Sequence, residues 1–170
     1  MAINDCAFTF QQLAASILPK HFRELEKVLR SPVRADKFVG FKTASAKALS
    51  VLERSTDFPG CYVFVDASKP VYVGISRTVV KRLVQHLNTD THYSASLVYR
   101  MAYEDFPHEM KRDQAMKDEQ FRRVFFAARE RLRRMKVATV EIRNDLELYV
   151  FEVYAAMQLD TSAWNTFRTH

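Results

Sequence analysis

The chain has 170 residues, of which 48% are hydrophobic and 27% charged, with 26 Lys or Arg against 20 Asp or Glu, so it is a basic globular protein and not a disordered one. Its three glycines, Gly40, Gly60 and Gly74, cannot form a G-x-G-x-x-G or Walker loop, which excludes nucleotide sites of that kind. Its two cysteines, Cys6 and Cys61, cannot form a disulfide framework, and no C-x-x-C or H-E-x-x-H pattern is present to bind zinc.

The first 58 residues are expected to form a helical extension without a recognisable site. Apolar spacing predicts a helix over Phe8–Arg30, interrupted at Pro19, and a shorter helix over Thr43–Arg54. The stretch Met1–Gln12 has no Lys or Arg and leads into no long apolar run, unlike a secretory signal. Apolar runs elsewhere, such as Val124–Ala128, are far shorter than a bilayer span of about 20 residues. We therefore expect a cytoplasmic protein without a membrane segment.

A β-hairpin is predicted next, followed by a helix. Cys61–Val65 and Val71–Val73 are rich in β-branched and aromatic residues, and turn-forming residues separate them. In this prediction Gly74 ends the second strand. Apolar residues at helical spacing then predict a helix over Arg77–Leu87. Three residues at four-residue intervals lie on its polar side: Thr78, Arg82 and His86.

The positive surplus of the chain is concentrated in one stretch. Lys111–Arg143 holds eleven Lys or Arg against five Asp or Glu, a surplus of six that equals the net charge of the whole chain. Within it, apolar residues at steps of three and four predict a helix over Asp118–Met135, preceded by another over Ser94–Glu104. The basic helix carries Arg122, Arg123, Arg129, Arg133 and Arg134. These arginines form either a solvated face or a surface that contacts phosphates.

One carboxylate is predicted to be buried in the last helix. A strand over Lys136–Ile142 precedes this helix, which covers about Asp145–Leu159 and is apolar on nearly every side. Glu152 lies in its middle. An unpaired buried carboxylate is costly, so Glu152 is expected to be protonated, paired with an Arg or bound to a metal. From the helix alone, an ion pair with an Arg is the more ordinary interpretation.

Five elements taken in order resemble the GIY-YIG nuclease family. They are Gly60, Cys61 and Tyr62; Tyr72, Val73 and Gly74; Arg82 with His86; Glu152; and Asn165. The two tyrosines lie ten positions apart and Arg82 follows Gly74 by eight, and both spacings look like the family pattern. Cys61 stands where the family name has Ile, at a position that tolerates a small hydrophobe. The resemblance covers roughly Pro59–Phe167, with a helical insertion at about residues 93–135.

This resemblance implies hydrolysis of DNA phosphodiester bonds with one Mg²⁺ or Mn²⁺ ion in the site. Glu152 looks like the family's metal ligand, and a hard cation prefers such oxygen ligands. Arg82 is suited to the charge that develops on the phosphate oxygens. Gly74 would let the backbone turn sharply out of the strand and leave room for phosphate beside the following helix.

The remaining residues of the resemblance imply roles in proton transfer and positioning. Tyr62 looks like the family tyrosine that accepts a proton from the attacking water, which requires a cation to lower the pKa of its phenol. Tyr72 would position water or phosphate. His86 would orient a neighbour or share the proton transfer, and Asn165 would orient substrate or brace the site.

The sequence therefore predicts an α/β (α+β) fold with a small, mainly antiparallel three-stranded sheet flanked by helices. A GIY-YIG-like domain occupies residues 59–170, and the helical extension occupies residues 1–58. The predicted function is a metal-dependent endonuclease acting on DNA. Two alternatives remain open: a nucleic-acid-binding module of the same fold that does not cleave, and a protein-interaction module whose Arg-rich helix contacts an acidic partner.

Overall fold

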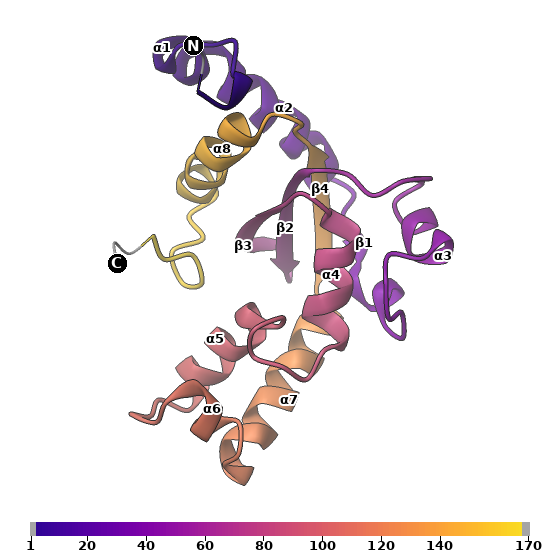
Figure 1. Cartoon of the computed structure of the whole chain (residues 1–170), viewed down its shortest axis with the longest axis vertical. Coiled ribbons are helices and arrows are strands. Elements are labelled where there is room, and N and C mark those ends of the chain that lie inside the picture. The colour runs from indigo at the N-terminus through magenta and orange to yellow at the C-terminus, as the bar shows by residue number, and fades with distance from the viewer. Residues whose placement is uncertain (1–2, 168–170) are drawn as a thin grey trace.

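The computed structural model describes residues 3–167 and has a mixed α/β fold built on one antiparallel sheet (Figure 1). The strand order is β1-β4-β2-β3, and the strands are β1 (Val33–Arg34), β2 (Gly60–Asp66), β3 (Lys69–Ser76) and β4 (Lys136–Glu141). The helices are α1 (Phe10–Gln12), α2 (Leu18–Leu29), α3 (Ala46–Ser50), α4 (Val79–Asn88), α5 (Ser96–Asp105), α6 (Arg112–Ala115), α7 (Glu119–Arg134) and α8 (Asp145–Gln158).

The sheet has four strands, so the prediction of three is wrong. The additional strand is β1, in which Val33 pairs with Val137 and Arg34 with Lys136 at the outer edge of β4. Two residues are too few to show the alternation that identifies a strand in a sequence. The first 58 residues thus contribute a strand to the sheet, and α2 packs against β4.

β2 and β3 form the predicted hairpin, and both strands are longer than expected. The turn residues Ala67 and Ser68 have left-handed φ values of 45° and 74°, as a two-residue hairpin turn requires. Gly74 does not end the second strand: β3 continues to Ser76, and Gly74 pairs with Tyr62 across the hairpin.

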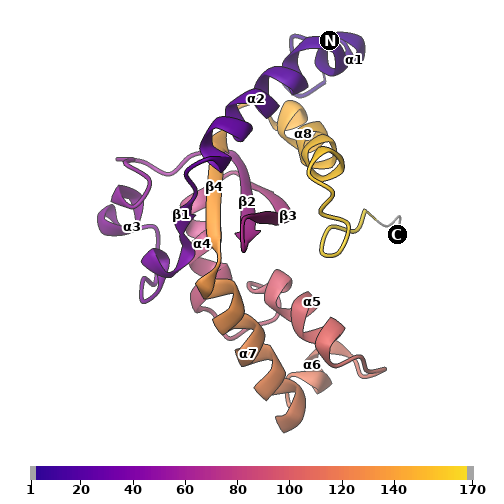
Figure 2. The same cartoon turned by 180° about the vertical axis from the view of Figure 1, so that it is seen from behind.

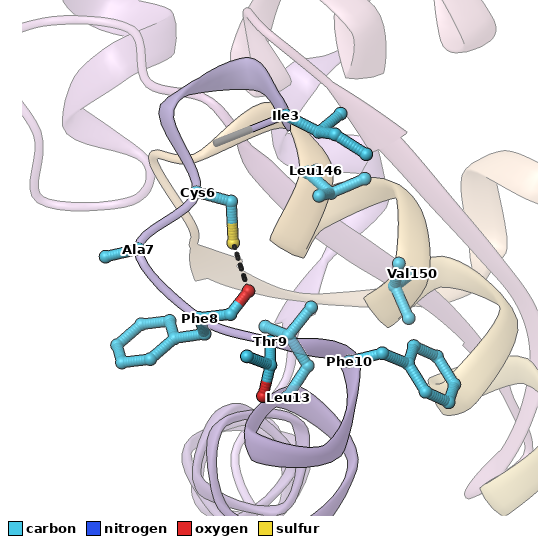
Figure 3. A pocket seen from close by; sticks show the side chains of 9 residues that line it. All are labelled: Ile3, Cys6, Ala7, Phe8, Thr9, Phe10, Leu13, Leu146 and Val150. Atoms are coloured by element: carbon cyan, nitrogen blue, oxygen red, sulfur yellow. Dashed lines mark hydrogen bonds between the residues drawn. The ribbon is translucent and has the colours of Figure 1, made fainter. Parts of the chain in front are cut away.

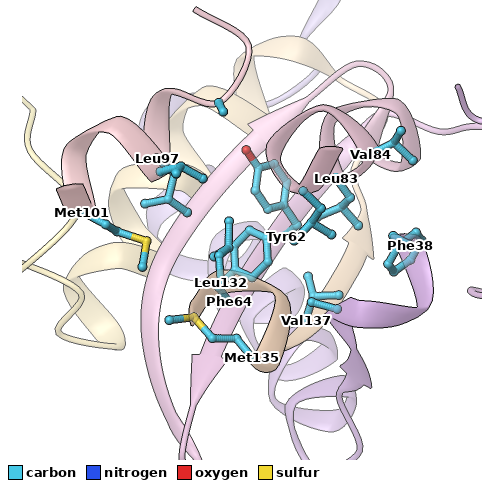
Figure 4. Packing of buried hydrophobic residues seen from close by; sticks show 14 of the residues in the cluster. Phe38, Tyr62, Phe64, Leu83, Val84, Leu97, Met101, Leu132, Met135 and Val137 are labelled. Carbon is cyan, nitrogen blue, oxygen red and sulfur yellow. The ribbon is translucent and has the colours of Figure 1, made fainter. Parts of the chain in front are cut away.

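β2 is buried on both faces, which explains its continuous apolar run. On one face Tyr62 and Phe64 join a core with α4, α5 and α7 (Figure 4). On the other face Cys61 and Val63 join a second core with α2 and α8. Figure 2, seen from behind, shows the sheet between these two layers of helices. The side-chain period of two along β2 therefore assigns Tyr62 to the α4 side of the sheet.

The amino-terminal helical region is irregular just before Pro19. Pro19 lies in the first turn of α2, and a π-helical turn over Leu13–Ile17 precedes it. The regular α-helix is thus interrupted immediately before Pro19, as predicted, but the helical path continues through the π-helical turn from Phe10 to Leu29.

Helices α5, α6 and α7 extend beyond one end of the sheet, whereas α1, α2 and α8 lie toward its other end (Figures 1 and 2). α7 begins after Asp118, whose side chain accepts a 2.8 Å hydrogen bond from the backbone N–H of Phe121. α5 and α7 pack together through buried side chains that include Met101 and Phe125. No helix within residues 3–167 is long and apolar enough to cross a membrane.

Candidate active site

Tyr62 of β2 and His86 of α4 form a buried pair. Tyr62 Oη and His86 Nε2 share a hydrogen bond of 2.9 Å, and the two side chains are 1% and 0% exposed. Burial raises the pKa of Tyr62 well above its usual value and lowers the pKa of His86 well below its usual value. Both side chains are therefore neutral at pH 7. The expectation of a polar, solvated face for α4 at His86 is wrong, because this face turns onto the sheet.

The ring of Tyr62 lies directly over Gly74. A Cβ at Gly74 would stand 2.5 Å from both Cζ and Oη of Tyr62, which is too short for a contact between non-bonded atoms. Glycine is required at this position because the tyrosine ring occupies the space of a side chain. The predicted role of Gly74 in leaving room for phosphate is not what the structure shows, since Tyr62 fills that room. A Cβ at Gly60 would collide with the backbone carbonyl of Val140, so Gly60 permits β2 and β4 to approach.

Arg82 is held by the segment that leads into α5. Its Nη1 donates to the carbonyl oxygen of Ser94 at 2.9 Å, and its Nη2 donates to Oγ of Ser96 at 3.0 Å. The side chain is half-buried and, within the described chain, forms no ion pair with a carboxylate. Arg82 lowers the pKa of both Tyr62 and Tyr72, against the larger effect of burial. Its guanidinium charge therefore acts on both phenols.

Tyr72 of β3 lies beside Tyr62, with the two ring centroids 6.2 Å apart. Tyr72 is more exposed than Tyr62, so its ring is the one that a ligand in solvent reaches first. Burial raises the pKa of Tyr72, the negative charge of Glu152 raises it further, and the charges of Arg100 and Arg82 oppose this rise. One carboxylate and two guanidinium groups thus influence the same phenol.

Glu152 lies on α8, which packs against β3, and its charge acts on the phenols of both tyrosines. It is half-buried, and burial raises the pKa of its carboxyl group. Among residues 3–167, no hydrogen bond or ion pair offsets this rise. The interpretation of Glu152 as half of a structural ion pair with an Arg is wrong: no Lys, Arg or His of residues 3–167 forms an ion pair with it. The site therefore contains a partly desolvated carboxylate without a counter-ion.

Arg100, on α5, was not predicted from the sequence as a site residue. Its Nη1 donates to the backbone carbonyl of Trp164 in the segment after α8. It opposes the rise in the pKa of Tyr72, and it too lacks a carboxylate partner among the described side chains. The sequence offers little to identify Arg100 as a site residue. It lies between Tyr99 and Met101, which are buried, and an Arg in such a helix is usually on the solvent-exposed face.

Asn165 binds the free edge of β3. Its Oδ1 accepts from the backbone N–H of Val73 and its Nδ2 donates to the carbonyl of Val73, both at 2.8 Å. The side-chain amide therefore pairs with Val73 as a neighbouring strand would, and it braces the strand that carries Tyr72. Both polar groups of the amide are engaged by the backbone.

Two of the five arginines predicted on α7 hold that helix to the end of α4. Arg129 pairs with Asp90 and donates to the carbonyl of Thr89 at 3.3 Å. Arg133 donates from Nε and Nη2 to the carbonyl of Leu87, at 2.9 and 2.7 Å. These contacts satisfy backbone carbonyls at the carboxyl end of α4, so both side chains have a structural role.

The other three arginines of this set are exposed. Arg123 pairs with Glu119 one turn earlier, and the guanidinium of Arg122 lies 5.6 Å from the ring centroid of Phe126. Arg134 lies at the exposed end of α7. The five arginines therefore do not form one free basic face, and contact with nucleic acid remains a prediction for them.

The side chains of the site suit a hard divalent cation. Across residues 3–167, no group of three or more His, Cys, Asp or Glu side chains is placed to hold a metal. Mg²⁺ needs fewer protein ligands than that, because it keeps several waters and is commonly held by one or two carboxylates together with substrate phosphate. Glu152, whose carboxylate lacks a counter-ion, fits this requirement.

A pocket lies away from this site, between the amino-terminal segment and α8 (Figure 3). It has a volume of about 540 Å³ and is lined mainly by apolar side chains, among them Phe8, Phe10 and Val150. The thiol of Cys6 points into it and donates to the carbonyl of Phe8 at 3.8 Å. This pocket lacks the convergent charged groups that the Tyr62 region contains.

Comparisons with protein-family models, with curated proteins and with solved structures give no match for this chain. A functional assignment therefore depends on the chemistry of the side chains around Tyr62 and Tyr72. These side chains come from the consecutive elements β2, β3, α4 and α5 and from α8, which lies much later in the sequence.

Proposed function

We propose that the chain is a divalent-metal-dependent endonuclease of the GIY-YIG type that hydrolyses DNA phosphodiester bonds. The observation that carries this proposal is the charge pattern around the tyrosines. Arg82 and Glu152 are both half-buried, both influence Tyr72, and neither has a counter-ion among the described residues. The resemblance of the ordered residues to the family gives the reaction class.

The unpaired charges favour a ligand that carries both signs. A fully buried charge without a partner destabilises a fold by several kcal/mol, and a half-buried charge destabilises it by less because solvent still reaches the charge. If Arg82 and Glu152 served stability alone, an ion pair between them would remove this cost. Their separate placement suits a phosphodiester bound to a metal ion, since the anion satisfies the guanidinium and the cation satisfies the carboxylate.

We assign each residue a role by its contacts. Ser94 and Ser96 fix one side of the Arg82 guanidinium, which leaves its remaining N–H groups to donate to phosphate oxygens. Glu152 would hold the metal, which when bound polarises the phosphate and stabilises the leaving oxygen. Tyr72, the more exposed phenol, positions water or phosphate.

Tyr62 and His86 act together in proton transfer. A neutral phenol whose pKa is raised is a poor base by itself. The hydrogen bond to Nε2 of His86 orients the phenol of Tyr62. A cation held by Glu152 would lower the pKa of this phenol, so that its phenolate can accept a proton from the attacking water.

The test is nicking of supercoiled plasmid by the purified chain with Mg²⁺. Glu152→Gln removes a charge at constant side-chain size, and Arg82→Gln removes a charge and keeps a polar side chain, so each should reduce nicking at least about 100-fold. Glu26→Gln and Lys20→Gln are the matched controls, because both residues are exposed on α2, which covers the opposite face of the sheet. Both controls should nick as the wild type does.

Three results contradict the proposal in different ways. Equal nicking by all four variants shows a contaminating nuclease or a different site. Salt-sensitive DNA binding with no cleavage under Mg²⁺ or Mn²⁺ supports the non-cleaving binding module. Absence of DNA binding even at low salt supports the protein-interaction module.

A further inference from the structure

Arg100 and Glu104 lie one turn apart on α5, yet they do not pair. Opposite charges at this spacing on a helix are neighbours and commonly form an ion pair. Here both are bound by Trp164: its indole Nε1–H donates to Oε2 of Glu104 at 2.6 Å, and its backbone carbonyl accepts from Nη1 of Arg100. Trp164 thus binds both charged groups.

Trp164 is fixed in this position by its own surroundings. It is 5% exposed, and the guanidinium of Arg131 lies 5.1 Å from its ring centroid. The backbone N–H of Trp164 donates to the carbonyl of Thr161 at 3.2 Å. The following residue, Asn165, is bound to the edge of β3. The separation of the charges on α5 is therefore part of the fold.

The consequence is a half-buried arginine with no counter-ion beside Tyr72. Only Nη1 of Arg100 has a partner within the described chain, and that partner is a neutral carbonyl. Arg82 binds Ser96, which lies one helical turn before Arg100 on α5. Arg100 in turn binds Trp164, whose neighbour Asn165 pairs with Val73, next to Tyr72 in β3. Both guanidinium groups are thus tied to the segments around Tyr72, and both charges act on its phenol. A guanidinium that keeps free N–H donors is well suited to phosphate.

We propose that Arg100 is a second phosphate-binding residue, and that Trp164 acts as a positioning residue that keeps Arg100 from pairing with Glu104. Arg82 and Arg100 would then hold the backbone of the substrate from α4 and α5 together. The phosphate contact would be independent of base sequence. This inference rests on the proposed function for the identity of the polyanion as DNA.

The experiment measures DNA affinity without metal, so that cleavage does not enter. A fluorescent 20-base-pair duplex is titrated with the chain in EDTA over a series of NaCl concentrations. Arg100→Gln should weaken binding about tenfold, and the slope of log K against log salt should become shallower by about one, as for the loss of one phosphate contact. Lys20→Gln, which also removes one positive charge, should leave the slope unchanged.

Trp164→Phe tests the positioning role. Phenylalanine keeps an aromatic ring but lacks the N–H, so the carboxylate of Glu104 is released to pair with Arg100. The variant should bind DNA about as weakly as Arg100→Gln. The double variant Trp164→Phe/Glu104→Gln removes the competing charge and should recover most of the wild-type affinity and slope. A structural role for Trp164 alone would not produce this recovery.

The results separate this inference from the proposed function. Unchanged affinity and slope in Arg100→Gln overturn the phosphate contact, and failure of the double variant to recover binding overturns the role of Trp164. Absence of DNA binding by the wild type overturns both the contact and the proposed function. If the wild type binds DNA but never cleaves it, the nuclease proposal fails while the binding series still decides the role of Arg100.

Discussion

Gly74→Ala should destabilise the protein by displacing Tyr62. The added Cβ would stand 2.5 Å from Cζ and Oη of Tyr62 and 2.9 Å from Cε2. The ring cannot move away freely, because it is 1% exposed and packs against Phe64 and His86, at centroid distances of 6.0 and 5.8 Å. The hydrogen bond between Tyr62 and His86 should be lost or lengthened as the ring moves.

The size of the effect follows from three contributions. Overpacking of this kind costs about 1–3 kcal/mol, the lost hydrogen bond adds about 1 kcal/mol, and alanine regains about 0.5–1 kcal/mol over glycine in a strand. The net loss in the free energy of unfolding is about 1–3 kcal/mol, which lowers Tm by roughly 3–10 °C in a chain of this size. Urea and thermal unfolding monitored by circular dichroism measure both quantities.

A double-mutant cycle with Tyr62→Leu identifies the cause. With the ring removed, Gly74→Ala should cost nothing or stabilise slightly, so that the two substitutions are strongly coupled. An equal cost of Gly74→Ala in both backgrounds would refute the reasoning, because the tyrosine ring would then not be what requires glycine.

The other predictions concern charge and hydrogen bonding. The pKa of His86 is lowered in the folded state, so unfolding takes up a proton below the ordinary pKa of about 6.5. The free energy of unfolding should therefore decrease as the pH is lowered below about 6.5, by up to about 1.4 kcal/mol per pH unit. His86→Gln should reduce this slope in unfolding experiments. The pKa of Glu152 is raised, so its ionisation disfavours the folded state: without metal, Glu152→Gln should raise Tm at pH 7 but not below about pH 4, where both states are protonated. Asn165→Asp loses the donor to β3 and should cost about 1–3 kcal/mol in urea unfolding. Arg129→Gln should lower Tm, whereas Arg122→Gln should leave Tm unchanged.

Local patterns predicted the elements that carry the site. The hairpin, α4, α7 and α8 all have a clear period of two or of three to four residues, and their observed bounds lie within a few residues of the predicted ones. The apolar surroundings of Glu152 predicted a buried carboxylate, whereas the side chain is half-buried. α8 also exposes Tyr149 and Met157, so it is not buried on every side. The periodic patterns depend only on residues that are close together in the chain, so they can be predicted from a single sequence.

Long-range contacts decided what the sequence did not predict. His86 has a polar side chain on a helix face that looks solvated in the sequence, and only the packing of α4 onto β2 buries it. Arg100 and Trp164 lie 64 positions apart, so no local spacing relates them. β1 forms only because β4 offers it an edge. In each case the packing or hydrogen-bond partner lies in a distant element, and contact with that partner outweighs the conformation or exposure that the local sequence favours.

The most direct test of the account is an anomalous-difference map from crystals of the chain soaked in MnCl₂ together with a short DNA duplex. The account predicts a Mn²⁺ peak at the carboxylate of Glu152, with a backbone phosphate bound between that ion and the guanidinium of Arg82. Manganese bound elsewhere while the Glu152 carboxylate has no ion, or DNA bound away from Tyr72 and Arg82, would contradict it.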